Sequence, residues 1–315
     1  MTQSNSAQNL AVFDNVVTAM AISLDGRQAI AGLGNGELQR LDLVSGKLIG
    51  KPFQIDEGEI KAVAFSPDGK YIVSAGLKAS KDFDAIIRLW NTQGDSIGDP
   101  LGEYDGYVVT SVAFSPDSKY IACGSTDTKI RLWDTTGSPI GQPFGEDFRP
   151  IKSLALSPDG KHIVSGAYRT VRLWDTTGNR TGGLFQGHDS DVNSVTFSPN
   201  GQYIASGGDV TVRLWDTMGN PIGGPFHGHE DTVLSVAFSP DSKYVASGGM
   251  DETARLWGLQ GNLIAKLEGQ GGFVSSLSFT LDGQFIVIGS GKTIKLWDVK
   301  TGRGLHCKNR LLMYT

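Results

Sequence analysis

The chain has 315 residues and a net charge of −5, and 42 of its residues are glycine, about twice the usual share. A hydrophobic fraction of 39% is enough for a sizeable core and argues against a largely disordered chain. The acidic balance argues against a protein that follows nucleic-acid phosphates, because such proteins usually carry a basic excess. Two cysteines, Cys123 and Cys307, are too few for a disulfide scaffold and fit a reducing compartment.

The first residues of the chain are polar and lack the basic and apolar regions of a secretory signal. No apolar run approaches the roughly 20 residues that span a bilayer. We therefore expect a cytoplasmic protein without a membrane partner. Residues 10–13 form the first segment that is typical of a strand.

From there the chain repeats one unit. Its six tryptophans each end the tripeptide Arg-Leu-Trp or Lys-Leu-Trp, and they lie 40 to 43 residues apart at Trp90, Trp133, Trp174, Trp215, Trp257 and Trp297. A seventh copy lies upstream with Leu41 at the Trp position, and a longer loop separates it from Trp90. We name each repeat by the residue at this position. A period of about 40 to 45 residues is typical of a propeller or a solenoid.

The Trp215 repeat shows the internal order of the unit. Residues 191–197, 202–206 and 211–215 predict three strands, the first two joined by a Ser-Pro-Asn-Gly turn. Residues 221–226 contain two prolines and two glycines, so this fourth strand must lie at a sheet edge, because proline cannot donate to a ladder. Such a meander has apolar residues on both faces and must stack against its neighbours. Seven units closing into a ring predict an all-β, seven-bladed β-propeller of four-stranded antiparallel blades.

These features resemble WD40 repeats, and the repeats are as similar to one another as in prokaryotic WD40 proteins. The resemblance rests on the Gly-His pairs at 187–188 and 228–229, the Ser-Pro-Asp-Gly turns and the Trp-Asp ends, and it extends from about residue 16 to 299. It implies an N-terminal segment over 1–15, seven WD40 repeats over 16–307 and a C-terminal tail over 308–315. A WD40 ring is usually closed by an N-terminal strand. Residues 10–13 fit that place, and residues 304–307 fit it from the other end; we favour the N-terminal segment.

Two sets of residues could be mistaken for a hydrolase triad: His188, Ser206 and Asp209, and His229, Ser247 and Asp251. The resemblance implies instead that each set forms a hydrogen-bonded structural tetrad within one blade, completed by Trp215 or Trp257. The other repeats are incomplete. Cys123 stands at a Ser position, Tyr168 at an Asp position, and Ile288 and Gly291 replace both in the Trp297 repeat.

Other chemical motifs are weak. Residues 289–293, Gly-Ser-Gly-Lys-Thr, resemble the end of a phosphate-binding loop, but Ile286 occupies a required glycine position and a strand follows instead of a helix. His227 and His229 flank a single glycine, whereas a zinc site needs three or four ligands. We expect no catalytic residue, no metal and no cofactor, and therefore not an enzyme.

The resemblance implies that partners bind the top face, which carries the loops into each first strand and the turns between the second and third strands. The family's contact positions and two adjacent residues give the candidate partner-binding set Glu59, Lys61, Phe83, Tyr107, Val108, Arg149, Lys152, Asp191, Asn193, Leu234, Met250 and Phe273. Several of these are apolar where solvent exposure is expected, which is the usual sign of a protein-binding surface.

We therefore expect a non-catalytic interaction scaffold: a monomeric propeller that binds a protein or peptide on its top face, with no nucleic-acid partner. The alternative is a ligand-sensing or recognition module of a prokaryotic signalling system, which would use the central channel or the top face. An enzyme is disfavoured, because no carboxylates, metal ligands or histidines converge on the predicted channel.

Overall fold

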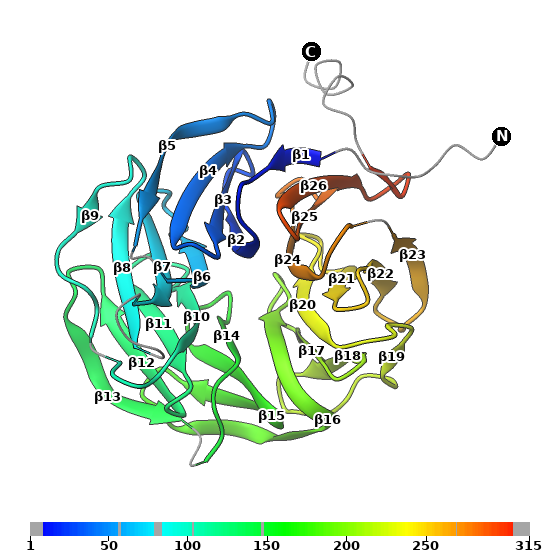
Figure 1. The fold of residues 1–315 in the computed structure, drawn as a ribbon. Helices are drawn as coiled ribbons and strands as arrows, with labels where there is room; N and C mark the ends of the chain where they lie inside the picture. The colour runs from blue at the N-terminus through cyan, green and yellow to red at the C-terminus, as the bar shows by residue number, and fades with distance from the viewer. Residues whose placement is uncertain are drawn as a thin grey trace.

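The computed structural model describes residues 9–55, 58–78, 84–102, 104–145, 148–268 and 270–304, and every regular element in these ranges is a β-strand. The strands form sheets arranged as a ring around a central axis (Figure 1). None of the described segments is a helix that could cross a membrane.

Four sheets have four antiparallel strands each. The first contains β2 (Val17–Ile22), β3 (Gln28–Leu33), β4 (Glu37–Asp42) and β5 (Leu48–Gln54). The second contains β6 (Ile60–Phe65), β7 (Tyr71–Leu77), β8 (Ala85–Asn91) and β9 (Ser96–Ile97). The third contains β10 (Val109–Phe114), β11 (Tyr120–Ser125), β12 (Lys129–Asp134) and β13 (Pro139–Gly145). The fourth, nearer the C-terminus, contains β20 (Val233–Phe238), β21 (Tyr244–Gly249), β22 (Ala254–Gly258) and β23 (Leu263–Leu267).

The Trp174 and Trp215 repeats share one six-stranded sheet. It contains β14 (Ser153–Leu156), β15 (His162–Asp175), β16 (Arg180–Phe197), β17 (Tyr203–Gly208), β18 (Thr211–Asp216) and β19 (Phe226–His227). β16 pairs with β15 as far as Asp191 and with β17 from Val192 onward. β19 is short, as the prolines of this edge require.

The prediction of seven separate blades is therefore wrong: the described residues form six sheets. The physical reason is the connection between the Trp174 and Trp215 repeats. Asp191 still pairs with Tyr168 across the top face, so strand pairing continues through the connection where a loop was expected.

The remaining sheet closes the ring and uses both ends of the chain. It contains β24 (Val274–Phe279), β25 (Phe285–Ser290), β26 (Thr293–Asp298), β1 (Asn9–Val12) and β27 (Arg303–Gly304). β1 pairs with residues 293–295 of β26, and β27 pairs with residues 297–298. Both segments considered for ring closure therefore pair with the outer edge of β26, and the N-terminal strand β1 pairs with the longer part of it. Residues 305–307 and the tail over 308–315 lie outside the described residues.

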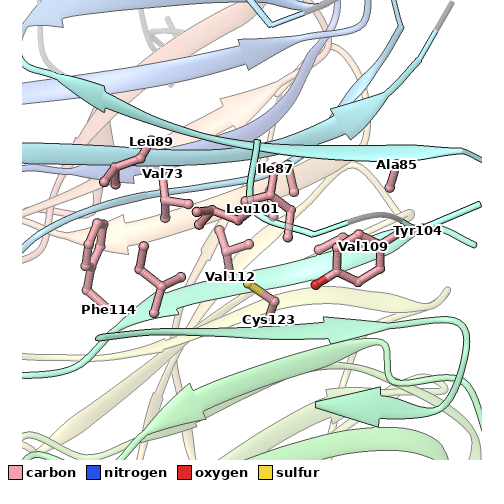
Figure 2. Close-up of a cluster of buried hydrophobic side chains, with 13 residues drawn as sticks. Val73, Ala85, Ile87, Leu89, Leu101, Tyr104, Val109, Val112, Phe114 and Cys123 are labelled. Carbon is pink, nitrogen blue, oxygen red and sulfur yellow. The ribbon is translucent and has the colours of Figure 1, made fainter. Parts of the chain in front are cut away.

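The hydrophobic core lies between adjacent sheets. Figure 2 shows one such layer, in which Val73 and Leu89 of the Trp90 repeat face Val112 and Phe114 of the Trp133 repeat. A second layer joins the last sheet to the first, because Phe13, Leu41 and Phe285 belong to one cluster. Each sheet therefore depends on its neighbours to bury its apolar faces.

Aromatic pairs tie the outer strands to the following repeat. The ring centroids are 5.1 Å apart for Phe53–Trp90, 5.8 Å for Phe144–Trp174, 5.7 Å for Phe185–Trp215 and 5.8 Å for Phe226–Trp257. Glycine permits the close approach of the inner strands. A Cβ on Gly207 would lie 2.6 Å from Cγ1 of Val233, so no larger residue fits there without displacing the next sheet.

The innermost strands β2, β6, β10, β14, β20 and β24 surround the axis (Figure 1), together with the C-terminal part of β16. Serine hydroxyls link them in sequence. Ser194 Oγ accepts the backbone N–H of Val236 at 3.0 Å, and Ser235 Oγ accepts that of Leu277 at 3.1 Å. Ser275 closes the circle, because its hydroxyl donates to the carbonyl of Val17 at 2.9 Å.

Candidate functional site

The two complete sets of His, Ser, Asp and Trp come together as connected networks. In the Trp257 repeat, His229 Nδ1 lies 2.9 Å from Asp251 Oδ2, and His229 Nε2 lies 2.7 Å from Ser247 Oγ. The indole N–H of Trp257 donates to the same Ser247 oxygen at 2.8 Å. Because an ionised carboxylate only accepts hydrogen bonds, the neutral imidazole donates from Nδ1 to Asp251 and accepts the Ser247 hydroxyl proton at Nε2.

The Trp215 repeat contains the same network. His188 Nδ1 lies 3.2 Å from Asp209 Oδ2, His188 Nε2 lies 2.8 Å from Ser206 Oγ, and Trp215 donates to Ser206 at 2.8 Å. Both serines are fully buried. A substrate therefore cannot reach either hydroxyl, and each serine oxygen also accepts an indole N–H within the packed sheet. We therefore interpret both networks as structural links within their sheets.

The carboxylates at the ends of the networks are held ionised. Burial acts to raise the pKa of Asp251, but the N–H of Glu230 and the side chains of His229 and Thr253 donate to it and hold its pKa below the usual value. Burial lowers the pKa of His229, and this outweighs the opposite effect of Asp251. Near neutral pH this network therefore contains a neutral imidazole and a carboxylate.

Other repeats keep only part of the network. Trp90 donates to Ser74, and Trp174 to Ser165, both at 2.8 Å. In the Trp133 repeat, Arg131 lies 5.0 Å above the Tyr104 ring and pairs with Asp127 at 2.6 Å. Cys123 is buried there, and burial raises the pKa of its thiol, so it is an inert core residue.

In the Trp297 repeat, buried Lys295 donates to the carbonyl of Gln270 at 2.8 Å. The Gly-Ser-Gly-Lys-Thr segment lies at the β25–β26 hairpin, where Ser290 donates to the carbonyl of Gly272 at 2.6 Å. Within the described ranges, no group of three or more His, Cys, Asp or Glu residues is placed to hold a metal ion.

Most polar candidates of the top face bind other residues of the same ring. Lys61 pairs with Glu59 at 2.6 Å, and Lys152 pairs with Asp191 at 2.8 Å. The side-chain amide of Asn193 donates to the carbonyl of Val233 in the next repeat at 3.0 Å. All five side chains are half-buried. A partner would have to compete with these contacts.

The apolar candidates differ in exposure. Tyr107 is 47% and Phe273 55% exposed, whereas Val108, Leu234 and Met250 are half-buried. Phe83 lies outside the described residues. The most exposed large apolar side chain in the described ranges is Phe148, at 92%.

Next to Phe148, Arg149 joins the loop before β14 to the bend of β15. Its guanidinium lies 5.2 Å from the centre of the Tyr168 ring, and its Nη1 donates to the carbonyl of Tyr168 at 3.0 Å. Tyr168 is 43% exposed. Because Tyr168 replaces the turn aspartate in this repeat, an exposed aromatic ring lies here in contact with Arg149.

A family model for the WD domain, G-beta repeat, matches residues 50–91, 98–134, 138–175, 179–216, 220–258 and 261–298. The chain belongs to the WD40 repeat family. The Leu41 repeat is not among these matches, although β2 to β5 form the same antiparallel sheet. No curated protein matches the sequence.

Phe148 of this WD40 chain was not predicted from the sequence as a candidate surface residue. The family's contact positions flank the first-strand Val or precede the turn Asp, and Phe148 is at neither. The available signal was an aromatic residue followed by Arg149 and Pro150 in a predicted loop, where few neighbours can cover a large side chain.

The stability of the WD40 ring is expected to fall as the pH is lowered from about 7.5 to about 5.5. The pKa of His229 is lower in the folded chain than in the unfolded one, so the unfolded chain binds the extra proton in this range. The contribution of His229 to the free energy of unfolding is complete above its pKa in the unfolded chain and is lost as the pH falls toward its pKa in the folded chain. Urea unfolding at both pH values measures the change, and His229→Gln is expected to reduce it. An equal pH dependence in this variant would contradict the assignment.

Proposed function

We propose that this WD40 ring is a non-catalytic scaffold that binds a protein or peptide on its top face. The observation that carries the proposal is the group of exposed aromatic side chains on that face: Tyr107, Phe148, Tyr168 and Phe273. Aromatic residues and arginine are enriched at protein interfaces, and Tyr and Arg are common among their energetic anchors. The rigid ring holds the loops that carry them, so a partner would bind with little ordering cost.

The residues of the two tetrads support the non-catalytic part of the proposal. Ser206 and Ser247 are the groups most similar to nucleophiles, and both are buried and hydrogen-bonded to tryptophan. A scaffold needs these networks only to keep its sheets in register. Their burial is consistent with a surface that binds without carrying out chemistry.

The test compares two triple variants as baits in a native lysate. The first, Tyr107→Asp, Phe148→Asp and Phe273→Asp, places charges on the top face. The matched control, Leu24→Asp, Met218→Asp and Leu281→Asp, places three charges on the opposite face at side chains that are 57%, 66% and 57% exposed. We expect a partner that binds wild type and the control but binds the top-face variant at least about tenfold less.

Circular dichroism and thermal unfolding establish first that both variants fold. A partner lost from the control and kept by the top-face variant would move the interface to the opposite face. A partner kept equally by both would exclude the aromatic residues of the top face as its anchors.

A further inference from the structure

The strongest unassigned feature is a groove of about 650 Å³ on the top face of the Trp174 repeat. It lies between the bend of β15 and the middle of β16, and the loop before β14 borders it. Its lining includes Arg149, Tyr168, Arg169, Arg172, Leu184 and Asp189. We name it the Arg149 groove.

The Arg149 groove is basic on an acidic protein. Arg149, Arg169 and one carboxylate, Asp189, are among its lining residues, together with Arg172, which already interacts with other residues, whereas the whole chain carries a net charge of −5. Glu146 and Asp147 precede Phe148 in the sequence and lie outside the described residues. Among the described lining residues the charge favours an anionic ligand.

Its two outer arginines are placed to donate hydrogen bonds to carboxylates. Arg149 is held against Tyr168 by the ring contact and by one hydrogen bond to a carbonyl, and a guanidinium carries five N–H donors in a rigid fork. Arg169 pairs with Asp189 at 3.2 Å, but their side chains are 52% and 84% exposed. An ion pair this exposed is weak, so a ligand carboxylate can replace Asp189 at little cost.

Apolar surface lines part of the same groove. Tyr168 and Leu184 in the lining are 43% and 37% exposed, and Phe148, which precedes Arg149 in the sequence but is not a lining residue, is 92% exposed. A small anion would leave these side chains in water. A peptide that carries both carboxylates and an aromatic or aliphatic side chain would use the charges and cover the apolar surface.

We propose that the Arg149 groove binds an acidic peptide segment, with carboxylates at Arg149 and Arg169 and an apolar side chain over Tyr168 and Leu184. The proposal rests on the proposed function, since it names the chemistry of the partner that the top face binds. Nucleic acid would offer phosphates and stacking bases to the same residues, but the acidic charge of the chain as a whole disfavours it.

The test uses fluorescein-labelled peptides of about 12 residues and fluorescence anisotropy on the full chain. The probes are three repeats of Glu-Glu-Phe-Glu, the same peptide with Lys for Glu, the same peptide with Ser for Phe, and an oligothymidylate of similar length. We expect the Glu-Phe peptide to bind most tightly, the Ser peptide more weakly and the Lys peptide not at all. Raising NaCl from about 50 mM to about 500 mM is expected to weaken binding.

The variant Arg149→Gln with Arg169→Gln is expected to weaken binding of the Glu-Phe peptide about tenfold. Its matched control is Lys119→Gln with Lys243→Gln, which removes two cations from turns on the opposite face, where the side chains are 80% and 71% exposed. The control is expected to bind like wild type. Equal loss in both variants would show that net charge alone governs binding and would overturn the proposal.

Two further results would overturn it: no binding of the Glu-Phe peptide at about 1 mM, or tighter binding of the oligothymidylate.

The pull-down distinguishes this proposal from the broader one. If the arginine variant retains a partner that the Tyr107, Phe148 and Phe273 variant loses, the top face binds proteins but the Arg149 groove does not select them. A different result is that the arginine variant loses the peptide while the aromatic variant still binds the lysate partner. The Arg149 groove would then bind acidic peptides, and the scaffold interface would lie elsewhere.

Discussion

Replacing Asp251 with alanine is expected to lower the free energy of unfolding by about 3 kcal/mol. Its carboxylate accepts hydrogen bonds from His229, from the backbone of Glu230 and from both the backbone and the hydroxyl of Thr253. It also lies 3.5 Å from Arg255, whose side chain is 5% exposed. Alanine would leave an imidazole N–H without an acceptor and a buried guanidinium without this countercharge. Urea unfolding monitored by tryptophan fluorescence measures the loss.

Asp216→Ala is the matched control. Asp216 accepts hydrogen bonds from the backbone of Met218 and from the backbone and side chain of Asn220, but it lies in an exposed turn. Water can replace the lost acceptor there, so we expect a loss of about 1 kcal/mol or less. Equal losses in the two variants would show that the tetrad adds nothing beyond local turn bonding.

The tetrads were expected from the resemblance to WD40 repeats, whose characteristic positions recur in a periodic sequence. In the observed register Ser206 lies opposite Arg213 and Ser247 opposite Arg255, so each serine is diagonal to the tryptophan two positions further along, within reach of its indole N–H. The same periodicity predicted the antiparallel meander, the proline-rich outer edges and the stacking of sheets around an axis. Features that repeat are constrained by every copy of the unit.

Features that occur once were not predictable in the same way. The sequence gives no sign that β16 continues across a connection, because this depends on the pairing of Tyr168 with Asp191 across two repeats. Likewise, both chain ends have a short strand pattern, and only the length of β26 allows them to share its edge.

The exposure of loop side chains could not be predicted from the sequence either. Met250 and Phe273 occupy comparable top-face positions, yet Met250 is half-buried and Phe273 is 55% exposed. Whether a loop side chain packs down depends on its neighbours from other repeats, which a linear pattern does not specify. Phe148 is the clearest case, since its side chain is 92% exposed.

Phe13→Ala is expected to lower the free energy of unfolding by about 3 kcal/mol, because it removes a buried aromatic side chain from the layer that closes the ring. Phe13 is 6% exposed and follows β1 directly. It shares a cluster with Leu41 and Leu43 of the first sheet and with Phe285 and Ile294 of the last. Its backbone N–H donates to the carbonyl of Lys292 at 2.8 Å, which fixes its position.

Val12→Ala separates the effect of packing from that of strand pairing. Val12 pairs with Thr293 in the same strand but is 63% exposed, so its truncation is expected to cost about 0.5 kcal/mol or less. Urea unfolding of both variants gives the comparison. If Phe13→Ala costs no more than Val12→Ala, the contact between the first and last sheets does not depend on the N-terminal segment. In that case the ring would be closed mainly by the pairing of β27 with β26, that is, by the C-terminal segment.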